Sequence, residues 1–188
     1  MDVTTVDRSI DRAVAQPSLP AAFLTRAEAS PDRVALRRFG SDEHLTLGAW
    51  ASRASAVAGG LASLGVARGD RVALLLTIRM EFHIADMGAL LAGAVPFSLY
   101  VTSPPNQLAE ILDNAEPGVL ITEAALLQTA RLLRDQHPGL THLVVVDPTE
   151  LQDGELSLAA VEARCPPDFN ARAGAAAAQR EDICTLVY

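Results

Sequence analysis

Residues 71–100 read RVALLLTIRMEFHIADMGALLAGAVPFSLY, and this stretch decides the fold. It holds two apolar runs, 71–76 and 95–100, on either side of a segment, 80–92, with helical spacing of its apolar residues. The two runs are continuous rather than alternating, which is typical of strands covered on both faces. A strand, a helix and a second strand predict a right-handed βαβ crossover between parallel strands.

The same alternation continues toward the C-terminus. Here the sequence predicts helices over 105–115 and 124–136, a short helix over 156–163, and strands over 119–122, 143–147 and 183–188. Pro105 suits a helix start, where its missing N–H is not needed. Residues 148–182 carry loop signals, and 174–179 are too simple in composition to assign. We therefore expect an α/β fold with a doubly wound, mostly parallel sheet, incomplete as part of a larger domain.

Upstream of this stretch, the sequence predicts a helix starting at Ser18, a β-hairpin over 34–47 and a helix capped by Thr46 that stops at Gly65. Gly59-Gly60 inside that helix indicates close backbone packing. Gly69 is expected in a tight turn with positive φ, and Gly93 is expected to end a helix. Residues 1–17 are interpreted as a flexible leader, and 18–188 as one domain.

Composition excludes several classes of function. The net charge is −8, and no basic run or patch of arginine and aromatic residues occurs, so nucleic-acid binding is not expected. All 15 basic residues are arginine. Without lysine, this chain cannot supply a Schiff base, a lysine general base or the lysine of a phosphate loop.

Two cysteines, Cys165 and Cys184, lack CxxC spacing and are interpreted as reduced thiols rather than a disulfide or a metal site. Residues 1–16 are too polar for a secretory signal. The longest apolar stretch, 87–101, is interrupted and is shorter than the roughly 18 residues that a membrane span needs. We therefore expect a cytoplasmic protein without a transmembrane segment.

No catalytic or metal-binding motif is present, including Walker A, GxGxxG after a strand, HExxH and GxSxG. His83 and Asp86 lie three residues apart on one predicted helix and are interpreted as a structural hydrogen-bonded pair rather than a catalytic dyad. Asp113 and Glu116 lie near a helix end, where capping or solvation explains them. Residue-level reasoning therefore assigns no catalytic, cofactor-binding or metal-binding residue.

Several segments, in order and spacing, resemble the N-terminal part of the adenylate-forming (AMP-binding) enzymes. They are LTLGAW at 45–50, LGVARGDRVA at 64–73, EF at 81–82 and LAGAVPF at 91–97. YVTSP at 100–104, with Gln107 and Ala115-Glu116, is most similar to the fatty-acid–CoA ligase branch (acyl-CoA synthetases). Pro105-Asn106 departs from the branch's usual small-acidic pair, which is expected to alter only the start of a helix.

The resemblance implies that a complete enzyme binds fatty acid, ATP, Mg²⁺ and CoA. It also implies that the chain stops just before the phosphate-binding loop, so no functional residue of the family can be carried onto it. We expect no ligase activity and no cofactor binding by this chain alone. The alternative is a non-enzymatic truncated paralogue or a module that pairs with a separately encoded remainder. A stand-alone flavodoxin-like nucleotide binder is disfavoured because no glycine-rich loop follows a strand.

One more expectation concerns association. If nothing covers the strand predicted at 183–188, its apolar side chains face water. Exposed apolar edges are templates for contact, so the isolated chain is expected to associate or to be poorly soluble despite its charge.

Overall fold

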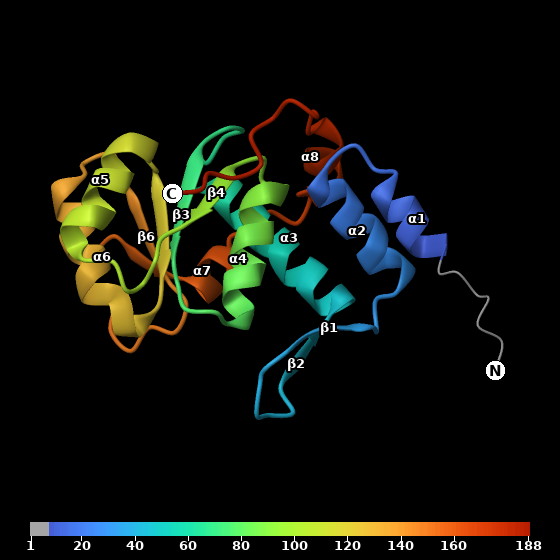
Figure 1. Cartoon of the computed structure of the whole chain (residues 1–188), viewed down its shortest axis with the longest axis horizontal. Coiled ribbons are helices and arrows are strands. Elements are labelled where there is room, and N and C mark those ends of the chain that lie inside the picture. The colour runs from blue at the N-terminus through green and yellow to red at the C-terminus, as the bar shows by residue number, and fades with distance from the viewer. Residues whose placement is uncertain (1–7) are drawn as a thin grey trace.

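A computed structural model describes residues 8–188, with side chains from residue 10 onward. Its centre is a five-stranded parallel sheet in the order β4-β3-β5-β6-β7, drawn in Figure 1. The strands are β3 (Arg71–Leu75), β4 (Val95–Ser98), β5 (Val119–Thr122), β6 (His142–Val145) and β7 (Glu155–Ser157). The predicted parallel, doubly wound sheet is confirmed.

Helices cover both faces of this sheet, because alternate residues of each strand point to opposite sides. On one face, Val72, Leu74 and Ile121 pack against α3 (Leu47–Ser63), α4 (Met80–Leu91) and α7 (Leu158–Ala163). On the other, Ala73 and Leu120 pack against α5 (Pro105–Ala115) and α6 (Leu127–Gln136). A short 3₁₀ helix, η1 (Ala124–Leu126), leads into α6.

A third layer lies outside α3 and α4. It consists of α2 (Leu19–Ala29) and α8 (Ala171–Ala177), whose apolar side chains meet those of α3 and α4 in a separate cluster around Phe23, Met87 and Ala175. The hairpin of β1 (Val34–Arg37) and β2 (His44–Thr46) projects from the lower edge in Figure 1. Thr46 caps α3 as predicted, since its Oγ1 accepts from the Ala49 N–H.

Glycines allow helices to approach one another closely, as the Gly59-Gly60 pair predicts. A β-carbon at Gly60 would lie 2.0 Å from the carbonyl oxygen of Val161 in α7, and one at Gly59 would lie 2.2 Å from Cys165 Sγ. Within α4, a β-carbon at Gly88 would lie 2.6 Å from Val57 Cγ1. A larger residue at any of these positions therefore requires a neighbour to move, and at Gly60 that neighbour is the backbone of α7.

Gly69 adopts φ = 84° and Gly93 adopts φ = 81°, which confirms the predicted turn and helix end. A β-carbon at Gly69 would meet nothing within 4 Å, so only its left-handed backbone conformation restricts the residue. We expect Gly69→Ala to lower the free energy of unfolding by about 1 kcal/mol, through backbone strain alone. Chemical denaturation measures this change. Gly139→Ala is the control, because its φ is not left-handed and its surroundings are equally open; equal losses in the two variants would contradict the explanation.

Three predictions at the ends of the domain differ from the structure. Helix α1 (Arg8–Val14) lies where a flexible leader was expected, with Ala13 buried; the rest of that prediction, residues 1–7, lies outside the described residues. Strand β7 was not predicted: residues 156–157 were expected to begin the helix over 156–163, but they belong to β7, and the helix starts at Leu158. Residues 174–179, left unassigned, contribute to α8.

The strand predicted over 183–188 does not form. Only one bridge, between Leu186 and Phe97, joins this segment to the free edge of β4. The Thr185 hydroxyl donates to the Pro96 carbonyl at 2.8 Å, and the Tyr188 ring meets Phe97 edge-on. Val187 is 89% exposed. The segment therefore has the composition of a strand, but it lacks the continuous hydrogen-bonded pairing with a neighbouring strand that would order it as one.

Within residues 8–188, no helix is both long and apolar enough to cross a membrane. Cys165 and Cys184 are both free thiols, as predicted.

Candidate functional site

The order of the strands marks the carboxyl ends of the central strands as a place for function. From β3 the chain moves outward to β4 and then crosses back to β5, so the direction of winding reverses between β3 and β5. In open α/β sheets, ligands bind at the carboxyl ends of the strands at this reversal. Thr77 follows β3 there and Glu123 follows β5, while Asp147 follows the neighbouring strand β6.

A single arginine, Arg79, joins the polar side chains at this edge. Its Nη1 donates to Asp147 Oδ2 at 2.9 Å and to Glu123 Oε2 at 3.3 Å, and its Nε donates to Glu81 Oε2 at 2.8 Å. The Thr77 hydroxyl donates to Glu123 Oε2 at 2.9 Å. The Glu123 side chain is buried and the Arg79 side chain is mostly covered, so these interactions are only partly screened by water.

The charges of this Arg79 cluster stabilise one another. Burial would disfavour the charged guanidinium, but the carboxylates of Glu81, Asp147 and Glu123 raise the pKa of Arg79 above its ordinary value. Burial likewise opposes ionisation of Asp147, yet the Ala124 N–H and Arg79 lower its pKa. Arg79 and Asp147 therefore keep their charges near neutral pH. The cluster holds the loops after β3, β5 and β6 together and leaves no strong base or nucleophile.

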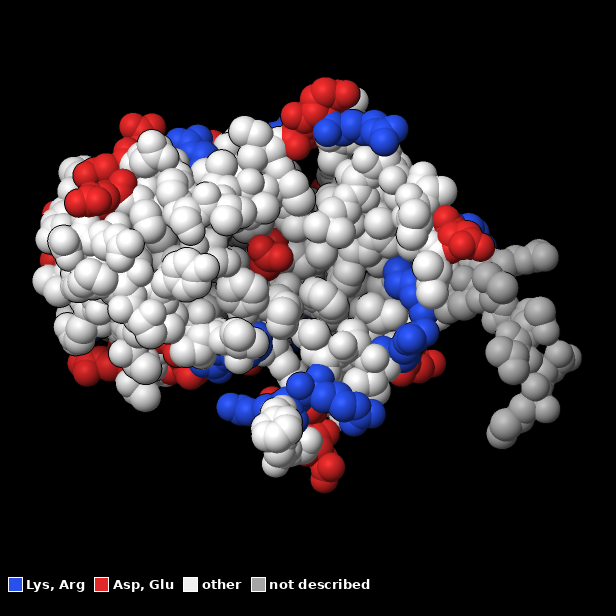
Figure 2. Space-filling model, viewed as in Figure 1, with Lys and Arg blue, Asp and Glu red and all other residues white. Residues whose placement is uncertain are grey.

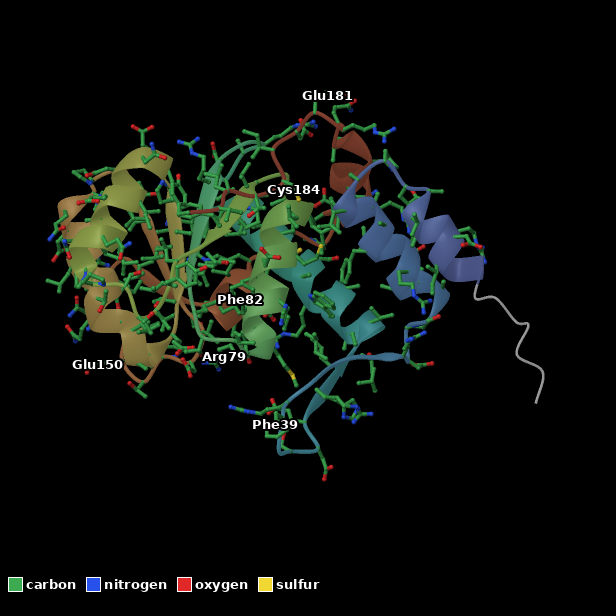
Figure 3. All side chains as sticks on the ribbon, in the orientation of Figure 1. Phe39, Arg79, Phe82, Glu150, Glu181 and Cys184 are labelled. Carbon is green, nitrogen blue, oxygen red and sulfur yellow. The ribbon has the colours of Figure 1, made fainter. Side chains whose placement is uncertain are left out.

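A hollow of about 320 Å³ opens beside the Arg79 cluster, between the β1–β2 hairpin and the start of α4. Figure 3 shows its surroundings, with Phe39 at the hairpin tip and Arg79 and Phe82 near the beginning of α4. Charged side chains from both walls border it, including Arg37 and Arg38.

The described residues do not fit the cofactors expected of a complete enzyme. A polyphosphate requires cations or free backbone N–H groups. The sheet edge instead presents three carboxylates that share Arg79. No group of histidine, cysteine, aspartate and glutamate side chains within the described part of the chain could hold a metal ion. We therefore assign no ATP or Mg²⁺ ligand to these residues.

The predicted hydrogen-bonded pair of His83 and Asp86 is wrong. The His83 ring packs edge-on against Trp50 and Phe82, and its backbone carbonyl accepts from Trp50 Nε1 at 3.0 Å. Burial lowers the pKa of His83 and raises that of Asp86. Helical spacing allowed contact between the two side chains, but the His83 ring packs instead against Trp50 of α3 and against Phe82, its neighbour in α4.

Structural roles for Asp113 and Glu116 are consistent with the prediction. Glu116 ends α5 with φ = 48°, and its N–H donates to the Leu112 carbonyl at 2.8 Å. The Asp113 carboxylate lies 3.2 Å from Nε2 of His137, at the α5–α6 contact.

Sequence reasoning missed the Arg79 cluster, although a signal was present. Thr77, Glu123 and Asp147 each stand within two residues of the end of a predicted apolar strand, where parallel topology gathers side chains at one edge. Their convergence on Arg79 required the strand order, which the sequence did not provide.

Comparison with known proteins places the chain in a family. Residues 23–188 match the family described as AMP-binding enzyme. The chain belongs to the AMP-binding enzymes. The crystal structure of the anthranilate CoA ligase AuaEII, in complex with anthranoyl-AMP, superposes with a TM-score of 0.79 at 27% identity, covering 92% of this chain and 33% of that one.

Two sequence relatives of this AMP-binding chain differ in length. The medium/long-chain-fatty-acid–CoA/3-oxocholest-4-en-26-oate–CoA ligase of Mycobacterium marinum is 34% identical over 121 residues, which are 64% of this chain and 22% of that enzyme. An uncharacterized protein of Mycobacterium tuberculosis is 41% identical over 126 residues, which are 67% of this chain and 70% of that protein. The chain thus spans about a third or less of the characterised ligases that it matches.

Proposed function

We propose that this chain forms the N-terminal portion of a fatty-acid–CoA ligase. Membership of the AMP-binding family and the fatty-acid ligases among its relatives support this substrate class. The YVTSP segment at 100–104 favours the same branch. The observation that carries the proposal is the agreement between the family match over 23–188 and the superposition over 92% of the chain.

In this proposal, residues 23–188 act as a scaffold within a cytoplasmic enzyme. The complete enzyme binds fatty acid, ATP with Mg²⁺, and CoA. The carboxylate attacks the α-phosphate of ATP, which gives acyl-AMP and releases pyrophosphate; the CoA thiol then takes the acyl group and AMP leaves. Positioning and electrostatic stabilisation of the phosphates supply most of such catalysis. The part of the chain described here contributes the five-stranded sheet and the loops held by the Arg79 cluster.

A chimera tests this role. Residues 23–188 replace the corresponding segment of the long-chain-fatty-acid–CoA ligase of Thermus thermophilus, which is 36% identical to this chain over 100 residues. We expect palmitate-dependent formation of AMP and palmitoyl-CoA, because the replaced segment has the same fold and supplies no catalytic group. The matched control carries Arg79→Ala in the chimera. This change should release the loops after β3, β5 and β6 from one another and reduce the rate of palmitoyl-CoA formation. A folded chimera without activity would contradict the proposal.

The chain alone is expected to be inactive. Its described residues offer no polyphosphate site and no metal-binding group, and the sequence contains no lysine. Fatty-acid-dependent pyrophosphate release by the purified 188-residue chain should equal that of a heat-denatured control. Release above that background would show that this portion carries catalytic groups of its own.

A non-enzymatic module is the second candidate. Two observations favour it: the polar edge of the sheet is satisfied internally by Arg79, and an uncharacterized Mycobacterium tuberculosis protein is matched over 70% of its own length. Under this alternative the chain acts through contact with another polypeptide. A folded chimera that lacks ligase activity would favour this second candidate over the first.

A further inference from the structure

Residues 178–184 form a linker between α8 and the C-terminal segment, and one side chain from elsewhere in the fold holds this linker. Arg68 Nη1 donates to the Ala177 carbonyl at the end of α8, and its Nη2 pairs with the Asp182 carboxylate. The same carboxylate accepts from the Gln179 N–H at 2.7 Å. Among the described residues, no other side chain outside the linker forms a hydrogen bond or ion pair with it. Arg68 therefore fixes both ends of the linker.

Arg68 itself lies on a well hydrogen-bonded turn between α3 and β3. The Gly69 N–H donates to the Gly93 carbonyl at 2.9 Å, and the Asp70 carboxylate accepts from the Ala67 N–H at 2.8 Å. A β-carbon at Gly93 would lie 3.5 Å from Arg68 Cβ, so the stem of the arginine packs beside this glycine. Figure 2 shows acidic and basic groups gathered at the top of the molecule, where Figure 1 draws the linker. The turn thus gives the linker a fixed point of attachment.

The charges of this pair support each other. The hydrogen bond to Asp182 raises the pKa of Arg68, and Arg68 together with the Gln179 N–H lowers the pKa of Asp182. Both side chains of the pair are partly exposed, so their interaction contributes little to the stability of the whole domain. Its effect is expected instead on the local opening of a segment that has few other contacts.

Beyond the linker, the chain runs along β4 with few contacts. Leu186 forms a single parallel bridge with Phe97. The Tyr188 ring lies edge-on to Phe97 with centroids 5.8 Å apart, and its hydroxyl donates to Asn114 Oδ1 at 2.8 Å. Because the bridge is parallel, the segment runs toward the carboxyl ends of the strands, the end of the sheet that carries the Arg79 cluster and that binds ligands in open α/β folds.

We propose that Arg68 is a positioning residue that sets the register of residues 183–188 against β4. Leu186 follows Asp182 closely in the chain, so holding Asp182 leaves few registers open to the bridge. A slip of one residue would exchange Leu186, which packs on the core, for Val187, which is 89% exposed. The role rests on the proposed function, because in the longer enzyme this register determines where the chain that follows the segment enters the carboxyl-end edge of the sheet.

Hydrogen exchange and NMR on the full 188-residue chain test the register. We expect Arg68→Ala to speed amide exchange over 183–188 about fivefold, as the loss of an exposed pair allows. The nuclear Overhauser contact between the Tyr188 and Phe97 rings should weaken in the same variant. The melting temperature should stay close to that of the wild type, because the pair is exposed.

Three variants separate the interaction from a general effect of substitution. Arg68→Lys keeps a cation beside Asp182 and should restore most of the protection and the ring contact. Arg180→Ala is the matched control, since this exposed arginine of the same linker forms no hydrogen bond or ion pair within the described residues. The double variant Arg68→Ala/Asp182→Ala should speed exchange by less than the product of the two single effects, because both singles remove the same pair.

The chimera with the Thermus thermophilus ligase connects the register to activity, since there the segment continues into the rest of that enzyme. Arg68→Ala should lower kcat for palmitoyl-CoA formation about fivefold, whereas Arg180→Ala should leave it unchanged. An inactive chimera would contradict the proposed function, while faster exchange in Arg68→Ala of the 188-residue chain would still support the positioning role. Equal exchange in Arg68→Ala and Arg180→Ala would overturn the proposal. So would an active chimera that Arg68→Ala does not slow.

Discussion

Replacing Glu155 by alanine is expected to lower the free energy of unfolding by about 3 kcal/mol, because it breaks a buried ion pair from one side. The Glu155 side chain is 0% exposed. Its two oxygens accept from Arg131 Nε at 2.7 Å and Arg131 Nη2 at 2.8 Å, and Oε2 also accepts from the Gln152 N–H at 2.8 Å. Alanine leaves Arg131 and this N–H without their acceptor.

Urea denaturation at low protein concentration measures the loss, so that association does not contribute to stability. The matched control is Glu43→Ala, which removes the exposed pair with Arg38 and should cost under about 1 kcal/mol. Similar losses in both variants would show that burial does not strengthen the Glu155 pair. Glu155→Gln keeps the size of the side chain and tests the charge alone.

The same residue should contribute to acid sensitivity. Arg131 lowers the pKa of Glu155 in the folded chain below its ordinary value, and burial opposes this effect only in part. The folded state therefore binds the Glu155 proton more weakly than the unfolded state. This contribution to stability is fully present above the unfolded pKa, about 4.3, and is lost as pH falls through the lower folded value. Glu155→Gln should lose less stability than the wild type across that acidic range; parallel curves would contradict the assignment.

Replacing Gly60 by alanine is expected to cost about 3 kcal/mol, by forcing α3 and α7 apart. The new β-carbon would lie 2.0 Å from the Val161 carbonyl oxygen and 2.7 Å from its carbonyl carbon. These are backbone atoms within a helix, so no side-chain rotation can relieve the clash. The gain of about 1 kcal/mol in helix propensity from glycine to alanine opposes the loss without cancelling it.

Thermal denaturation followed by circular dichroism measures the effect of Gly60→Ala. Gly118→Ala is the control, since its β-carbon would meet nothing within 4 Å and its φ is not left-handed. That variant should change stability by less than about 1 kcal/mol. An unchanged melting temperature for Gly60→Ala would show that α3 and α7 do not pack this closely.

The sequence by itself determined the parallel α/β class and most elements of the sheet. Strand β5 and helix α5 begin and end where the sequence predicts. These elements follow from local causes: continuous apolar runs, 3.6-residue periodicity, the Thr46 cap and the glycines at turns. The Gly59-Gly60 pair also predicted close packing, because glycine inside a helix has a cost that only a near neighbour explains.

Only the tertiary structure decided the rest, because those features depend on contacts between residues far apart in the chain. Strand β7 forms because β6 offers it a ladder, and its Glu155 is buried because Arg131 reaches it from α6. The segment 183–188 has the composition of a strand, yet one bridge to β4 does not order it as one. The Arg79 cluster likewise arises from strand order, which local patterns do not encode.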